Sequence, residues 1–136
     1  IGSAAALKTL EVMERERSWE RITAIGEGYR RRLKQVGEMH GVEVAISGLP
    51  ALTSYSATGE QELEFKTLIT QELLKRNILA ATGFYASLPH GKLELDRLFD
   101  ALDPIFAQIR ACQDGREDVM SLLEGPTCHA GFKRLN

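Results

Sequence analysis

Two adjacent residues near the end of the chain, Cys128 and His129, have the side chains best suited to metal binding or nucleophilic catalysis. A structural metal site usually needs about four ligands at recurring short spacings. The other candidates, His40, His90 and Cys112, stand far from this pair and from one another in sequence. A cysteine nucleophile would also need groups that stabilise an oxyanion, and no motif supplies them. The sequence therefore favours free thiols over a metal centre or a Cys–His nucleophile.

Charged residues elsewhere cluster on stretches with helical periodicity, where exposure to solvent is the simplest interpretation. Arg30, Arg31 and Arg32 are consecutive, but successive side chains on a helix point about 100° apart, so they form no single basic cluster. Acidic residues occur at Glu11, Glu14, Glu16, Glu60, Glu62 and Glu64. Acid–base catalysis needs carboxylates that are partly buried, and nothing in the pattern buries these. No glycine-rich phosphate loop opens a helix.

Composition restricts the function classes further. The 136 residues suffice for one domain, and 43% of them are hydrophobic, which is enough for a core. The formal net charge of −2 gives no electrostatic reason to expect nucleic acid as a partner. No apolar run approaches the roughly 18–20 residues that span a bilayer, so we expect no membrane partner. With two cysteines and no signal peptide, we expect a reducing, cytoplasmic location.

Hydrophobic periodicity predicts four long helices and four short strands. The expected helices cover 3–16, 19–39, 58–76 and 92–113, with a short helix at 117–123; the expected strands cover 42–46, 52–57, 78–80 and 85–88. Strands followed by packed helices predict an α+β fold, in which a small sheet of about four strands is covered by helices. We expect one domain over residues 1–114 and a C-terminal tail extension over 115–136.

Individual residues refine the expected boundaries. Ser18 is a candidate N-cap, and Thr58 with Gln61 fits a capping box at the start of the third helix. Asn77 is expected to end that helix in a left-handed conformation. Pro104 should kink the last long helix without ending it, because the apolar spacing continues beyond it. Gly26 and Gly28 are expected to allow close helix packing.

Three segments in this order resemble the class III (glutamate-1-semialdehyde aminomutase-like) aminotransferases. They are GSAAALKTLEVM at 2–13, ELLKRNILA at 72–80, and GFYASLPH at 83–90 with the LDR that follows at 95–97. The resemblance spans roughly residues 1–113. It implies the C-terminal small domain of a fold-type I aminotransferase, which is itself a small α+β domain. The chain begins at Ile1 in a helical pattern without an initiator methionine, so we expect a fragment of a longer enzyme.

The same resemblance implies a cofactor and a partner. Members of the family hold pyridoxal phosphate on a lysine of the large domain, which should lie upstream of Ile1. The lysines present here are Lys8, Lys34, Lys66, Lys75, Lys92 and Lys133, and none matches that position. The implied function is therefore that of a C-terminal fragment of a pyridoxal-phosphate-dependent aminotransferase or aminomutase that lacks the catalytic lysine. The expected partners are the large domain and a second subunit of a homodimer, and the isolated fragment should be inactive.

Many class III members bind a substrate carboxylate with an arginine in the strand before the last helix. The matching stretch here, 85–88, contains no arginine, which fits a semialdehyde-type or otherwise atypical amino donor better. Thr82, Tyr85 and His90 are the candidates for facing the substrate cleft, although His90 also fits a turn residue that bonds a backbone carbonyl. The alternative function is a stand-alone α+β protein-interaction module without catalysis.

Overall fold

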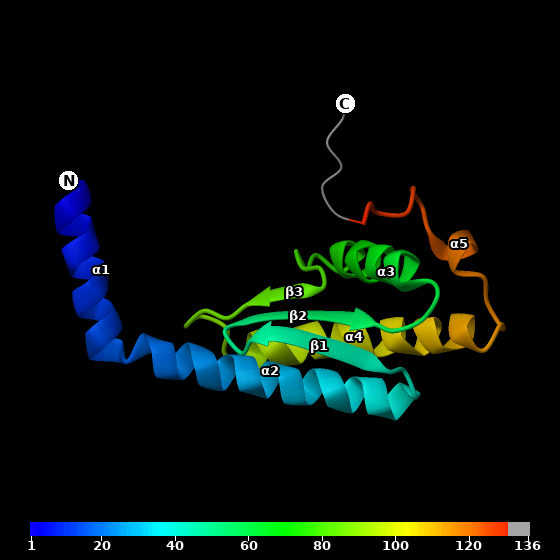
Figure 1. Cartoon of the computed structure of the whole chain (residues 1–136), viewed down its shortest axis with the longest axis horizontal. Coiled ribbons are helices and arrows are strands. Elements are labelled where there is room, and N and C mark those ends of the chain that lie inside the picture. Colours follow the sequence, from blue (N-terminus) through cyan, green and yellow to red (C-terminus); the bar gives the residue numbers. More distant parts are fainter. Residues whose placement is uncertain (131–136) are drawn as a thin grey trace.

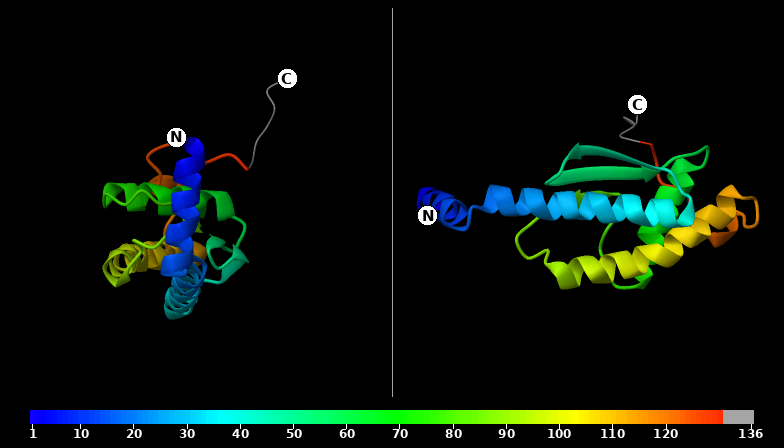
Figure 2. Two further views of the ribbon diagram at one scale, coloured as in Figure 1. Left: turned by 90° about the vertical axis from the view of Figure 1, so that its left-hand side faces the viewer. Right: turned by 90° about the horizontal axis from the view of Figure 1, so that it is seen from below.

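The structure is a computed structural model that describes residues 1–130. Its elements are α1 (Gly2–Glu16), α2 (Ser18–His40), β1 (Val44–Leu49), β2 (Leu52–Ala57), α3 (Glu62–Lys75), β3 (Gly83–Tyr85), α4 (Lys92–Gln113) and α5 (Val119–Leu122), shown in Figure 1. The strands form one antiparallel sheet in the order β1-β2-β3. Helices α2 and α4 run along the sheet, and α1 projects away from the body (Figures 1 and 2).

The predicted α+β fold is confirmed, but the expected number of four strands is wrong, because the described residues contain three. The stretch 78–80 forms no strand, since its amides are bonded locally: Ile78 donates to Leu73 O at 2.9 Å and Ala80 donates to Ile78 O at 3.1 Å. The last strand comes earlier than expected, at 83–85 instead of 85–88. It ends there because the chain turns, with the His90 amide bonded to Ser87 O at 3.0 Å.

One face of the sheet and three helices form the core. Along β2, alternate residues Thr53, Tyr55 and Ala57 are buried, as the twofold repeat of a strand requires. They meet fully buried side chains from α2, α3 and α4, which include Leu33, Leu68, Ile69, Leu102, Ile105 and Phe106. The apolar stripe of α1 is different: no residue of that helix is buried.

The helix-end signals were partly right. Asn77 has the expected left-handed conformation (φ 57°), and α4 continues through Pro104. The capping box at Thr58 is wrong: α3 begins at Glu62, and the Thr58 hydroxyl bonds Glu43 O at 3.3 Å, which ties β1 to the end of β2. Ser18 makes no capping bond either, because left-handed Arg17 makes the turn from α1 into α2.

The turn of the β1–β2 hairpin lies directly on α2. A Cβ atom added to Gly26 would lie 1.8 Å from Pro50 O, so only glycine allows the two backbones to be this close. One helical turn later, Arg30 donates to Ser47 O at 3.0 Å and to Thr53 Oγ1 at 3.1 Å. Gly26 therefore permits close packing of the helix, as expected, here against the hairpin turn. Gly28 makes no such close approach, because the nearest atom to its Cβ would belong to the Arg31 side chain, at 3.8 Å.

The expected solvated face of the arginine run is wrong for two of its three members. Arg30 binds the β1–β2 hairpin as just described. Arg32 pairs with Asp96 of α4 at 2.7 Å, and its guanidinium carbon lies 4.4 Å from the centre of the Phe99 ring. Arg31 alone is exposed. Helix α2 lies between the sheet and α4. Two residues along the helix the side chain has rotated by about 200°, so Arg30 points at the sheet and Arg32 points at α4.

Replacing Gly26 with alanine should destabilise the fold, because the new methyl group would force the helix and the hairpin turn apart. Overpacking of this kind costs about 1–3 kcal/mol. Gly28→Ala is the matched control in the same helix: its Cβ would meet only the Arg31 side chain, at 3.8 Å. Since alanine is the better helix former, Gly28→Ala should raise stability by about 0.5–1 kcal/mol. Urea unfolding measures both, and an equal effect of the two changes would contradict the close approach.

Acid should weaken the fold through Glu72 on α3. Burial raises the pKa of this carboxyl, but hydrogen bonds from Lys75, Arg76 and Gln71 outweigh it and lower the pKa from 4.5 to about 2. A depressed folded-state pKa stabilises the fold at pH values above 4.5, and that contribution is lost as pH falls toward 2.

Unfolding midpoints measured across that pH window should therefore fall less steeply for Glu72→Gln than for the unchanged chain. Glu60→Gln is the control, since Glu60 is exposed and makes no ion pair within residues 1–130. Identical acid profiles for the unchanged chain and Glu72→Gln would show that Glu72 is not the group responsible.

Candidate functional site

A cleft of about 450 Å³ lies between the connection after α3, strand β3 and the start of α4. Its walls are mostly apolar, with polar groups at a few positions: it is lined by Asn77, Ile78, Leu79, Ala80, Gly83, Phe84, Tyr85, His90, Glu94, Leu95, Arg97 and Leu98. An apolar cleft with a few converging polar side chains is the usual form of a small-molecule site. We therefore take it as the candidate site.

Backbone hydrogen bonds hold the strand that forms one wall. The Tyr55 amide donates to Thr82 O and the Ala86 amide donates to Ala51 O, each at 2.9 Å, so β3 is fixed to β2 at both ends. The left-handed residue Asn77 turns the chain out of α3 and sends the apolar stretch 78–80 across the opening. The cleft thus depends on the sheet and on the end of α3.

His90 is fixed within the cleft wall by its neighbours. Its Nδ1 accepts a hydrogen bond from the Ser87 backbone N–H at 3.1 Å, and its ring packs on Phe84 with the ring centres 5.0 Å apart. Phe84 in turn stacks on Tyr29 of α2 at 4.1 Å. His90 is thus a turn residue, as one of the two interpretations expected: its backbone N–H donates to the Ser87 carbonyl at 3.0 Å, while its ring accepts from the Ser87 amide.

The contact between the Ser87 hydroxyl and His90 Nδ1, at 3.1 Å, does not make an activated nucleophile. The Nδ1 lone pair already accepts the Ser87 amide proton, so it is not free to take the hydroxyl proton. A neutral His90 in this arrangement carries its proton on Nε2. The side chain can donate a hydrogen bond to a ligand.

The three residues expected to face a substrate cleft do not lie together. Tyr85 and His90 both line the cleft, and the Tyr85 side chain is largely exposed. Thr82 lies instead in a separate depression of about 280 Å³, which Ser54 and Lys66 also line. Thr82 lies in the bend before β3, whereas Tyr85 is the last residue of that strand, so their proximity in sequence did not predict a shared depression.

Sequence reasoning missed two charged residues of the cleft, Glu94 and Arg97, on the first turns of α4. The Glu94 carboxylate accepts from the Gly91 amide at 3.0 Å, so it is held at the helix start. Within residues 1–130, the Arg97 side chain makes one hydrogen bond, a long one of 3.4 Å to Arg76 O, so its guanidinium can still bind an anion. The available signal was their position in the helix: Glu94 precedes Leu95 and Arg97 precedes Leu98, and both leucines also line the cleft.

No lysine among residues 1–130 lines this cleft. Lys8, Lys34, Lys75 and Lys92 pair with carboxylates on their own helices, and Lys66 lies beside Thr82; Lys133 lies outside the described residues. The described part of the chain therefore does not supply the group that binds pyridoxal phosphate covalently.

The remaining candidates for chemistry are also dispersed. Within residues 1–130, no three side chains of the metal-binding types come together. Cys112 is buried in the core, and burial raises the pKa of its thiol. Cys128 is bonded through its amide to Thr67 of α3, and His129 is exposed. No described helix is both long and apolar enough to cross a membrane.

Comparison with known proteins gives a likeness of fold. No protein-family profile matches the chain, and no curated protein sequence matches it. Among solved structures, the FumI protein of Sphingopyxis sp. MTA144, in its PLP internal aldimine form, superposes with a TM-score of 0.71 at 18% identity. That match covers 88% of this chain and 30% of the FumI chain.

Two further solved structures match less of the chain. An omega-transaminase from Sphaerobacter thermophilus matches with a TM-score of 0.58 at 21% identity, and a transaminase with PLP bound matches with 0.60 at 24%. Each match covers 72% of this chain and 24% of the other. The chain thus has the fold of one part of these three proteins and spans less than a third of their length.

The bond to Ser87 predicts the tautomer of His90. In its neutral form the ring should carry its proton on Nε2, which long-range nitrogen–proton NMR spectra identify directly. Ser87→Gly removes the hydroxyl but keeps the amide, so the tautomer should not change. Ser87→Pro removes the amide donor, so the preference should weaken. A proton on Nδ1 in the unchanged chain would contradict the arrangement.

Proposed function

We propose that this chain is the small C-terminal domain of a class III (glutamate-1-semialdehyde aminomutase-like) pyridoxal-phosphate-dependent aminotransferase or aminomutase. The likeness of fold to one part of three solved transaminase structures carries the proposal. The three motif segments support it, because they occur in the family's order and lie in α1, at the end of α3, and at β3 with α4.

The catalytic lysine belongs, in this proposal, to a large domain upstream of Ile1. Pyridoxal phosphate supplies the electron sink for amino transfer when it is bound. The described residues do not fit that cofactor by themselves, because none of their lysines lines the cleft. What they can supply is one wall of the active site and the surface that contacts the rest of the enzyme.

The exposed apolar side chains support such a contact. Leu79, Tyr85 and Leu93 lie at or beside the cleft, with exposed fractions of 94%, 72% and 76%. On α1, Leu7 and Leu10 are also largely exposed. Grouped apolar residues on a protein surface usually mark an interface. A large domain that covers them would close the cleft and exclude water from it.

The substrate proposal rests on the charges of the cleft. The stretch 85–88 has no arginine, which fits a semialdehyde-type amino donor. Among the described residues, the arginine that lines the cleft is Arg97 of α4, and His90 belongs to the same lining. We further propose that the complete enzyme is a cytoplasmic homodimer, in which Tyr85 and His90 face the substrate.

The isolated chain should neither retain pyridoxal phosphate nor transfer amino groups. After incubation with the cofactor and dialysis, its absorbance spectrum should show no lysine-bound pyridoxal. The same residues expressed in frame with the upstream coding sequence should retain the cofactor and show aminotransferase or aminomutase activity. His90→Ala in that longer protein should lower activity, and Thr82→Ala, on the other face, is the matched control.

A stable adduct on one lysine of the isolated chain would contradict the proposal that the site lies elsewhere. A gene that begins near Ile1, with no upstream domain, would instead favour a stand-alone interaction module. The exposed leucines of α1 and of the cleft rim are the observation that suits that alternative.

A further inference from the structure

The outer face of α3 is occupied by a segment that comes more than 50 residues later in the chain. Four residues at four-residue spacing, Leu63, Thr67, Gln71 and Lys75, form a stripe along the helix. Each of them contacts the segment 122–128, which follows α5. We refer to these four residues as the α3 stripe and to residues 122–128 as the strap.

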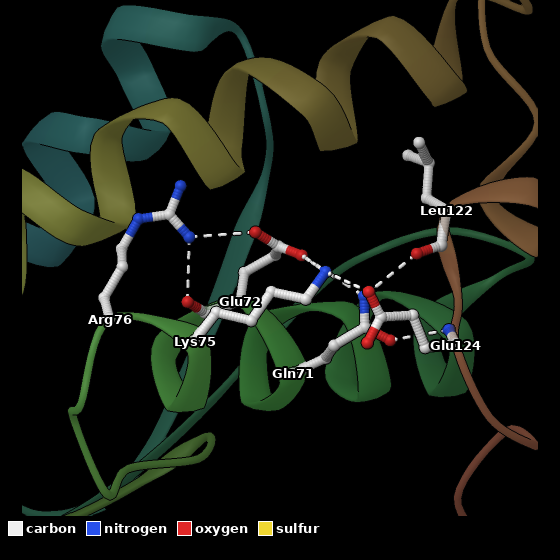
Figure 3. A network of polar contacts seen from close by, with 6 residues as sticks. All are labelled: Gln71, Glu72, Lys75, Arg76, Leu122 and Glu124. Carbon is white, nitrogen blue, oxygen red and sulfur yellow. Dashed lines mark hydrogen bonds and ion pairs between the residues drawn. The ribbon is translucent and has the colours of Figure 1, made fainter.

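Gln71 is the centre of this contact (Figure 3). Its Nε2 donates to Leu122 O at 2.9 Å, and its Oε1 accepts from the Glu124 amide at 2.8 Å. A carbonyl can only accept and an amide N–H can only donate, so the orientation of the Gln71 side chain is fixed. Gln71 thus binds the backbone on both sides of Leu123 and does not depend on the side chain there.

Bonds on either side of Gln71 extend the contact. Lys75 Nζ pairs with the Glu124 carboxylate at 2.8 Å and also with Glu72 of its own helix at 2.8 Å (Figure 3). At the other end, the Cys128 amide donates to Thr67 Oγ1 at 2.9 Å, and that hydroxyl donates to Leu63 O at 2.8 Å. The stripe thus recognises two backbone amides, one carbonyl and one carboxylate.

The strap has an apolar start and a polar remainder. At its start, Leu122 and Leu123 pack against the core, next to Val119 of α5, which is fully buried. Beyond them, Glu124, Gly125 and Pro126 are exposed, and the bonds to the α3 stripe are polar. Polar bonds on a surface exchange readily with water, so this part of the strap can leave without unfolding the core.

We propose that the α3 stripe is a binding site for an extended peptide bearing a carboxylate, and that the chain's own strap is its exchangeable resident ligand. Breaking the bonds at Gln71 releases the strap as a unit and opens the site to the same peptide supplied from outside. This inference is independent of the proposed aminotransferase function.

Hydrogen exchange on the full chain tests whether the strap is held by Gln71. The amides of Glu124 and Cys128 should exchange slowly in the unchanged chain. In Gln71→Ala both should exchange at least about tenfold faster, as expected for the loss of two hydrogen bonds, while the amide of buried Ile105 keeps its rate. Gln113→Ala is the matched control, because it removes a comparable bond, to Thr58 O at 3.0 Å, away from the strap.

Two outcomes of that experiment would overturn the proposal. Fast exchange at Glu124 and Cys128 in the unchanged chain would show that the strap is not bound. Equal acceleration at Ile105 in Gln71→Ala would show that Gln71 supports the whole fold and not the strap alone.

Binding from outside tests the site itself. Glu124→Pro removes the amide donor from the resident strap and leaves the α3 stripe intact. A fluorescein-labelled peptide of residues 117–130 should bind this full-length variant saturably by fluorescence anisotropy, and should bind the unchanged chain at least about tenfold more weakly. The double variant Gln71→Ala, Glu124→Pro should lose the binding. Two results would refute an exchangeable site: equal binding of the peptide to Glu124→Pro and to the double variant, or no binding to Glu124→Pro.

Discussion

The close approach of α2 to the turn of the β1–β2 hairpin is the constraint on which the rest of the structure depends. Gly26 allows the backbones to touch at Pro50, and Arg30 binds the carbonyls of Ser47 and Gly48 in β1, just before that turn. Hydrogen bonds from a charged donor are stronger than those between neutral groups. Because the hairpin carries β3 along its far edge, this contact also sets where the last strand can lie.

The shape of the candidate cleft depends on this contact between α2 and the hairpin. Phe84 of β3 stacks on Tyr29 of α2, and His90 packs on the other side of Phe84. Tyr29 also lies edge-on to Tyr55 of β2, and burial raises the pKa of both phenols above their ordinary value. Both phenols therefore stay protonated at physiological pH. An aromatic wall of this kind can orient a ligand in the cleft.

The described residues present two kinds of surface. The cleft rim and α1 expose leucines, whereas the outer face of α3 is covered by the strap. The difference is chemical. The surface formed by the cleft rim and α1 is apolar, which suits a large permanent contact. The outer face of α3 makes a row of polar bonds to backbone groups, which suits an exchangeable contact.

The sequence by itself determined the long helices, because an apolar repeat near 3.6 residues acts within one segment: 19–39 and 92–113 were expected, and Ser18–His40 and Lys92–Gln113 were found. It also gave the left-handed turn at Asn77, which depends on one side chain. Only the tertiary structure decided that Arg30 binds a β1 carbonyl 17 residues away, that the described residues form three strands, and that His90 but not Thr82 lines the cleft. These outcomes depend on contacts between segments that are distant in sequence. The hydrophobic periodicity of one segment does not determine which other segment it will contact.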